Sequence, residues 1–273
     1  TMNGADLWIQ QNSPELNYIS AGSFPISQYL LPLFDGLSSN VVFIIERSAW
    51  WLHIIGILCF LNYLYYSKHL HILLAFPNTY FANLNAKGKF SNLKSVTNEV
   101  KMMLDPSIDP YSNASPVEVS KFGASDVFDL SKIQLLNAYT CTECGRCTSE
   151  CPANQTGKKL SPRKIMMDTR DRVEAVGRNI DTNKGEFKPD GKELLSDYIS
   201  KEELWACTSC NACVEACPIG IDPLSIIMDM RRYLVMEKSD APSELNNMMS
   251  NIENNGAPWP FNQMDKLNWK NEI

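Results

Sequence analysis

Two cysteine-rich segments contain the residue types best suited to redox chemistry. They read CTECGRCTSECP (141–152) and CTSCNACVEACP (207–218), and both follow the spacing C-x2-C-x2-C-x3-C-P. In this pattern three thiolates can bind three corners of a [4Fe-4S] cubane, while the fourth binds the cluster of the other run. We therefore predict one cluster on Cys141, Cys144, Cys147 and Cys217, and a second on Cys207, Cys210, Cys213 and Cys151.

Zinc binding and disulfide formation are the alternatives for these cysteines. A structural zinc site takes four ligands, usually from two separated pairs, and eight cysteines at this spacing exceed that need. Disulfides are disfavoured because neighbouring loop cysteines pair poorly and cytoplasmic thiols stay reduced. The ninth cysteine, Cys59, lies in an apolar stretch, so we expect it to be a small hydrophobic residue without chemistry.

Helices are expected on both sides of each run. Capping boxes that begin at Ser131 and Ser200 predict a helix leading into each run. The dipeptides Ser161-Pro162 and Asp222-Pro223 predict a helix shortly after each run, because serine or aspartate caps and proline fits the first helical position. Each half is thus expected to be a helix, a cluster loop and a helix.

The two halves resemble each other beyond the cysteines. The segments SPRKIMMDTRDRV and DPLSIIMDMRRYL share residue types at matching positions, including Arg170 with Arg231. Cys207 follows Cys141 by 66 positions, which include a Gly-, Lys- and Asp-rich loop expected at 177–192. This spacing favours an all-α fold, an α-helical ferredoxin domain, over the small bacterial ferredoxin with strands. Its core is expected to contain an apolar stripe of Ile165, Met166, Ile226, Ile227, Met230, Leu234 and Val235.

A long apolar stretch lies well before the cysteines. Ala49–Tyr66 is 18 residues without a formal charge, close to the roughly 20 that cross a hydrocarbon layer. Aromatic residues at both ends fit interfacial belts. We predict a transmembrane helix over 41–77, ended by Pro77 and belonging to a larger membrane domain. A buried core helix and a cleavable signal peptide are the weaker alternatives.

The distribution of basic residues predicts the orientation of this helix. Residues 1–40 contain no Lys or Arg, whereas several lysines follow the apolar stretch. The positive-inside rule then places the ferredoxin domain on the cytoplasmic side of the inner (cytoplasmic) membrane. Residues 1–40 are expected to form an external loop with an interfacial stretch at Phe24–Leu37, preceded by further transmembrane helices.

Two histidines of the apolar stretch suggest haem. His53 and His71 are 18 residues apart, which is five turns of a continuous helix, so both would lie on one face about 27 Å apart. That arrangement suits axial ligation of two b-type haems, with the second ligands from quinone- or haem-bearing partner helices. His69 would point away from this face and is expected at the interface.

The remaining sequence is expected to be a connector over 78–130 and the dicluster domain over 131–273. The connector contains Pro106, Pro110 and Pro116, and a short helix is expected at Leu93–Leu104. The whole chain has 25 Lys and Arg against 31 Asp and Glu, a net charge of -6. This balance gives no basic excess for nucleic-acid binding.

The chain resembles a known superfamily in these segments. The paired runs, the helices that begin at Ser161 and Asp222, and the tail NNGAPW (254–259) resemble the heterodisulfide reductase and glycolate oxidase iron–sulfur subunit superfamily. With SKHLHILLAFPNTYF (67–81), they are similar to its membrane-anchored Fe–S oxidoreductases, whose membrane region is like the nitrate reductase gamma subunit. The resemblance implies electron flow between a membrane quinol or haem and a soluble partner.

The resemblance also predicts what this chain does not do itself. Family members that reduce disulfides carry CCG motifs, and no cysteine follows Cys217. We therefore expect an electron-relay subunit whose catalytic partner, a CCG-domain or other Fe–S protein, is a separate polypeptide. The alternative is an Fe–S redox sensor or scaffold without a dedicated electron-transfer pathway. An iron–sulfur subunit of the succinate dehydrogenase type lacks support, because no further cysteine set for a [2Fe–2S] centre is present.

Overall fold

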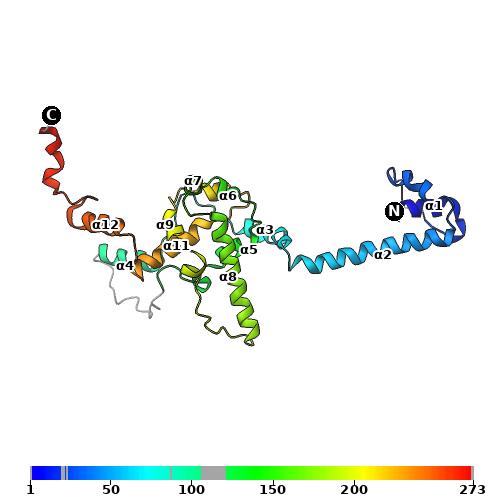
Figure 1. The fold of residues 1–273 in the computed structure, drawn as a ribbon, viewed down its shortest axis with the longest axis horizontal. Helices are drawn as coiled ribbons and strands as arrows, with labels where there is room; N and C mark the ends of the chain where they lie inside the picture. The colour runs from blue at the N-terminus through cyan, green and yellow to red at the C-terminus, as the bar shows by residue number, and fades with distance from the viewer. Residues whose placement is uncertain (1, 20–21, 23, 87, 106–120, 272–273) are drawn as a thin grey trace. The chain divides into compact units, whose positions relative to one another are not determined.

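The computed structural model describes residues 2–19, 22, 24–86, 88–105 and 121–271 (Figure 1). Its regular elements are helices, and the described residues contain no strand, only an isolated bridge between Leu195 and Ile199. The all-α prediction is therefore confirmed. The chain divides into two compact units, Thr1–Leu70 and His71–Ile273, which are described separately below.

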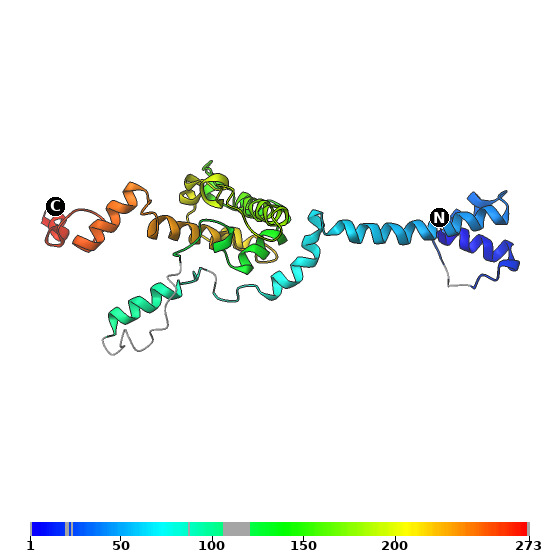
Figure 2. The ribbon, with the colours of Figure 1, turned by 90° about the horizontal axis from the view of Figure 1, so that it is seen from below.

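In the first unit, α1 (Met2–Asn12) packs along the N-terminal part of α2 (Ser39–Leu64) and against the 3-10 segment η2 (Ser27–Phe34) (Figure 2). A second short 3-10 turn, η1 (Pro14–Leu16), follows α1. The side chains that share this small core are Ala5, Trp8, Ile9, Phe34 and Val42. The segment expected as a loop is thus largely helical, and η2 lies within the stretch expected at the membrane interface.

Helix α2 is long and apolar. It has 26 residues, and among the described residues it is the one helix that is long and apolar enough to cross a membrane. Its buried residues are only Val42, Glu46 and Leu64, so most of its large apolar side chains are exposed. Exposed apolar surface of this extent is typical of a site that contacts lipid or another protein.

The apolar helix ends earlier than the sequence predicts. After Leu64, the Ser67 hydroxyl accepts a hydrogen bond from the His69 N–H at 3.2 Å, and this side-chain bond replaces a helical one. The chain continues through η3 (Lys68–Leu70) into α3 (His71–Tyr80). Pro77 lies inside α3 instead of ending the helix. The prediction of one helix over 41–77 is therefore wrong.

The unit that contains the cysteines begins at His71, before the expected start at 131. Helix α3 packs against α5 (Lys132–Thr140), and Asn78 Nδ2 donates to the carbonyl of Ile219 at 2.9 Å. Residues 121–130 also belong to this unit, because the Ala124 N–H donates to the Asp229 carbonyl at 3.0 Å. The expected short helix is confirmed as α4 (Lys94–Leu104). The connector prolines Pro106, Pro110 and Pro116 lie outside the described residues.

Three helices form the centre of this unit: α5, α8 (Pro162–Thr182) and α11 (Pro223–Met236). Six residues of the predicted stripe are buried, namely Ile165, Met166, Ile226, Ile227, Met230 and Leu234, while Val235 is half-buried. Both capping boxes and both caps before proline are present. Because α8 continues to Thr182, the loop expected from Gly177 begins six residues later.

Shorter elements complete the unit. They are η4 (Val127–Asp129), α6 (Arg146–Ser149), α7 (Pro152–Gln155), η5 (Leu194–Tyr198), α9 (Lys201–Ala206), α10 (Ala212–Glu215), α12 (Ser243–Asn255) and η6 (Gln263–Asn271). Helices α6 and α10 pack against each other, so the two cysteine loops are neighbours.

Candidate iron–sulfur site

The two cysteine loops follow the same backbone path. Helices α5 and α9 end at the first cysteine of each run, and α6 and α10 carry the third. The residue before the second cysteine has positive φ in both loops, 60° at Glu143 and 56° at Ser209. The residue after it does too, 82° at Gly145 and 61° at Asn211. Left-handed backbone suits glycine and asparagine but is uncommon for glutamate and serine.

The fourth cysteine of each run interacts electrostatically with cysteines of the other run. Burial is the main cause that raises the pKa of Cys141 and of Cys147, and the charge of Cys217 raises both further. Burial likewise raises the pKa of Cys207 and that of Cys213, the latter to about 12, and the charge of Cys151 adds to both. These interactions are the ones that the exchanged ligation predicts, and the charge of Cys147 also acts on Cys213.

One cavity is lined by Cys151 of the first run together with cysteines of the second run. Its walls include the apolar side chains of Leu160, Pro162, Leu224 and Ile227, and it is lined by the thiols of Cys151, Cys207, Cys210 and Cys213. This donor set and its dry surroundings fit an iron–sulfur cluster.

The spacing and protonation of the thiols bear on what they can bind. Within the described ranges, no three or more His, Cys, Asp or Glu side chains form a group that could hold a single metal ion. Because burial raises the pKa of four of the thiols, iron must displace their protons on binding.

An arginine from the helix after each run supports the loop of that run. Arg170 on α8 donates from Nη2 to Glu143 Oε1 at 2.6 Å. Arg231 on α11 donates to the carbonyls of Leu204 and Cys207, both at 2.5 Å, and to Ser209 Oγ at 3.3 Å. The two arginines occupy matching positions of the duplication, so their different partners are a real difference between the halves.

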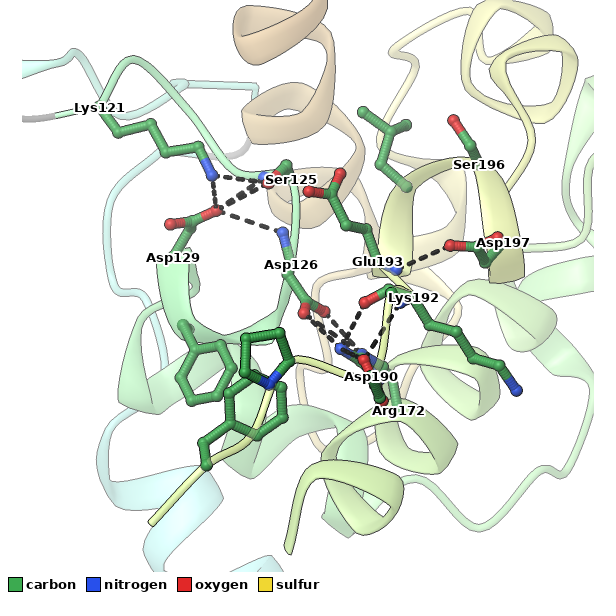
Figure 3. Close-up of a pocket in the computed structure, with 15 residues that line it drawn as sticks. Lys121, Ser125, Asp126, Asp129, Arg172, Asp190, Lys192, Glu193, Ser196 and Asp197 are labelled. Carbon is green, nitrogen blue, oxygen red and sulfur yellow. Dashed lines mark hydrogen bonds and ion pairs between the residues drawn. The ribbon is translucent and has the colours of Figure 1, made fainter. Parts of the chain in front are cut away.

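A second, larger cavity of about 580 Å³ lies by residues 121–129 and 187–197, and no cysteine lines it (Figure 3). At its edge, the fully buried Arg172 donates to both carboxylate oxygens of Asp126 and of Asp190 and to the Lys192 carbonyl. These bonds join three chain segments, and hydrogen bonding to Asp126 is the main cause that raises the pKa of Arg172. The arrangement is structural.

The two histidines predicted to bind haem lie on different helices. His53 lies on α2 in the first unit, whereas His71 is the first residue of α3 in the second. The prediction of a shared helix face required one continuous helix, and the break after Leu64 removes that basis. His69 lies on η3, with its ring centroid 6.2 Å from that of Phe60.

Residues 140–221, which include all eight clustered cysteines, match the family described as "4Fe-4S dicluster domain". The chain therefore contains a long apolar helix followed by a 4Fe-4S dicluster domain, and this family description names no haem. No solved structure matches the chain.

Curated relatives extend the similarity beyond this domain. The chain is 30% identical over 279 residues to "Probable iron-sulfur-binding oxidoreductase FadF" of Bacillus subtilis (strain 168), covering 92% of this chain and 37% of the relative. It is 26% identical over 286 residues to "EtfAB:quinone oxidoreductase" of Syntrophomonas wolfei, covering 98% and 37%. It is 32% identical over 165 residues to "Probable membrane-anchored ferredoxin" of Chromohalobacter salexigens, covering 55% and 24%.

These similarities place the chain among iron–sulfur oxidoreductases. It is related to FadF and, over shorter stretches, to subunits of CoB–CoM heterodisulfide reductases. The resemblance seen in the sequence is thus confirmed at this level. The chain spans a little over a third of the length of the first two relatives.

Sequence reasoning found the cysteines but not the groups that hold their loops. The positive φ values of Glu143 and Ser209 give no sequence signal, because neither residue type favours that conformation. The sequence showed Arg170 and Arg231 only as matching positions of the duplication and did not indicate that they contact the cysteine loops. Arg172 could have been noticed, because it lies in line with the buried Ile165 and Val176 of α8.

Proposed function

We propose that this chain is the membrane-anchored electron-transfer part of an oxidoreductase. Its eight clustered cysteines hold two [4Fe-4S] clusters, and each cluster takes three ligands from one run and the fourth from the other. Each cluster supplies one-electron redox chemistry. The protein contributes the ligands, the dry surroundings and the short path between the two loops.

The observation that supports this proposal most is the cavity lined by Cys151 together with the first three cysteines of the second run. Two of its four thiols, those of Cys151 and Cys213, are buried, and the second cysteine of each run, Cys144 and Cys210, is exposed. Each loop thus has one exposed cysteine, whereas its other cysteines are buried or half-buried. An exposed cysteine is where an electron can enter or leave by contact with a partner.

The membrane part of the proposal rests on α2. Its exposed apolar side chains fit a lipid environment, and the relatives include a quinone oxidoreductase and a membrane-anchored ferredoxin. We place the quinone at the membrane and the dicluster unit on the cytoplasmic side of the inner membrane, following the lysines after the apolar stretch. The catalytic partner, a CCG-domain or other Fe–S protein, docks on the cluster side.

Anaerobic purification of the full chain in detergent tests the cluster content. About eight iron and eight sulfide per chain are expected, with two reducible EPR signals that are reoxidised by a quinone analogue. Clusters that are lost on exposure to air and never reduce the quinone analogue would refute the relay and favour a sensor. Iron-free protein would refute the clusters themselves.

Serine variants test the exchanged ligation. C151S is expected to change the same EPR signal as C210S, whereas C217S changes the same signal as C144S. C59S is the matched control, since Cys59 lies on α2 and contacts no cluster loop in the proposal. A C151S change confined to the signal altered by C144S contradicts the exchange.

Membrane insertion of α2 has its own test. The substitution Leu58→Arg, at an exposed residue near the middle of the uncharged stretch Ala49–Tyr66, is expected to weaken insertion by about 2.5–3.5 kcal/mol. The L58R chain should therefore leave the membrane fraction in a carbonate wash that retains the wild type and L58A. Equal retention of L58R would contradict a membrane-spanning α2.

A further inference from the structure

The two halves hold their cluster loops in one way but with different charge. In both loops the residue before the second cysteine, which has positive φ, turns its backbone N–H toward the first cysteine. The Ser209 N–H donates to Cys207 Sγ at 3.4 Å, and the Glu143 N–H likewise lowers the pKa of Cys141 against the larger effect of burial. Donation of N–H groups to sulfur stabilises the more negative, reduced state of a cluster.

The arginine behind the first loop is neutralised by a carboxylate. Arg170 is paired with Glu143 at 2.6 Å and, at the longer distance of 3.8 Å, with the exposed Asp171; although burial opposes its charge, these carboxylates keep the pKa of Arg170 above its ordinary value. From the side of the first cluster, the cation and the carboxylate form a dipole with no net charge. Its effect on the cluster therefore falls off quickly with distance.

The arginine behind the second loop has no such partner. Arg231 donates only to neutral oxygens and packs over the ring of Trp205, with its Cζ 5.0 Å from the ring centroid. Among the described residues no carboxylate lies within ion-pair distance of it. Burial lowers the pKa of Arg231, and the Cys207 thiolate is the one charge that raises it. Its cation is directed at the second cluster loop.

We propose that Arg231 is a positioning residue that raises the reduction potential of the cluster held by Cys207, Cys210 and Cys213, through an unneutralised charge and by holding the Ser209 N–H on Cys207. The inference rests on the two clusters proposed above. One electron moves from the reduced first cluster to the oxidised second cluster, and no bond or proton changes. Arg231 therefore biases this exchange toward the second cluster.

Other charges near the second cluster are shared by all variants. Asp222 lies near Cys213 and raises its pKa, but it caps α11 by accepting from the Ser225 N–H at 3.0 Å. Because Asp222 is present in every protein compared, its effect cancels in the differences. The prediction therefore concerns shifts of potential, whatever the absolute order of the two clusters.

The test is a potentiometric EPR titration of the full chain with dithionite, with the two signals assigned by C144S and C210S. S209E gives the second loop the residue that the first loop has at the same position and φ, so the fold should tolerate it. S209E and R231M are expected to lower only the midpoint assigned to the second cluster. Each should change the electron distribution between the clusters about tenfold, which is about 59 mV for a one-electron couple.

Three further variants make the test specific. R231K keeps the charge but loses the planar guanidinium that donates to the two carbonyls, so it should shift the midpoint of the second cluster less than R231M does. E143S leaves Arg170 with only the exposed Asp171 carboxylate, 3.8 Å away, as an ion-pair partner and should raise only the first midpoint. Removing both partners with R170M/E143Q should change the first midpoint little, because the pair has no net charge.

The outcomes separate this inference from the proposed function. S209E and R231M shifting the second midpoint alone, with E143S shifting the first the other way, support it. Two reducible clusters whose midpoints do not move, or that move together, overturn the role of Arg231 and leave the relay standing. Wild-type protein without two reducible clusters overturns both.

Discussion

Removal of the buried Arg172 guanidinium is expected to destabilise the dicluster unit more than any other single charge change on α8. Arg172 has 1% of its side chain exposed, and its partners Asp126 and Asp190 have 13% and 25% exposed. Its contacts include Nε to Asp126 Oδ1 at 2.9 Å, Nη2 to Asp126 Oδ2 at 2.7 Å and Nη1 to Asp190 Oδ2 at 2.5 Å. R172M leaves the largely buried carboxylates of Asp126 and Asp190 without this cation.

The magnitude follows from this burial. Removing one partner of a buried ion pair costs about 3–5 kcal/mol, because the other charge stays out of water. For a unit of this size, 1 kcal/mol shifts the melting temperature by about 2–4 °C, so R172M should lower it by roughly 6–20 °C. R172K keeps the charge but not the forked geometry and should lie between R172M and the wild type.

The assay is thermal unfolding of the anaerobic full chain, followed by far-UV circular dichroism at a fixed scan rate. R178M is the matched control, because Arg178 is on the same helix and pairs with Glu174, yet 78% of its side chain is exposed. An exposed pair contributes about 0.5 kcal/mol or less, so R178M should change the melting temperature by no more than about 2 °C. Equal melting temperatures of R172M and R178M would refute the reasoning from burial.

Two more predictions concern backbone packing and pH. In urea unfolding, G123A should be more destabilising than G185A by about 1–3 kcal/mol. Both glycines have positive φ, 85° and 100°, but only at Gly123 would an added Cβ meet backbone, 2.2 Å from a carbonyl oxygen of α11. Equal losses of stability in the two variants would contradict this. Burial opposes ionisation of Glu203, but the Ser200 N–H and the Lys164 ammonium outweigh it and lower the pKa of Glu203 below 4.5. The stability it contributes is present above the unfolded-state pKa and is lost as pH falls through the lower folded value. The difference in unfolding free energy between wild type and E203Q should therefore be about 1 kcal/mol at pH 7 and shrink below about pH 4, and a constant difference would count against the pair.

Local signals in the sequence predicted much of the dicluster unit. The capping boxes at Ser131 and Ser200 and the caps before Pro162 and Pro223 lie where the structure begins its helices. Such signals depend on residues within one turn, so no tertiary contact can override them easily. The cysteine spacing likewise predicted the 4Fe-4S dicluster domain that residues 140–221 match.

Features decided by tertiary contacts could not be predicted in this way. The apolar pattern continues past Leu64, and only the Ser67 hydroxyl bond to His69 and the packing of α3 on α5 explain why one helix becomes two. The start of the second unit at His71 likewise depends on contacts with residues far along the chain, such as that of Asn78 with Ile219. Haem ligation by His53 and His71 was inferred from an unbroken helix, so the break after Leu64 removes its structural basis.

The exchanged ligation proposed for Cys151 and Cys217 has a consequence for assembly. Under the proposed ligation, neither half of the duplication can complete a cluster alone, so insertion of iron fastens the two halves to each other. Maturation and decay then become cooperative events of the whole domain. A chain that lacks the thiol of Cys151 or of Cys217 should therefore be recognised by cellular quality control as incompletely folded.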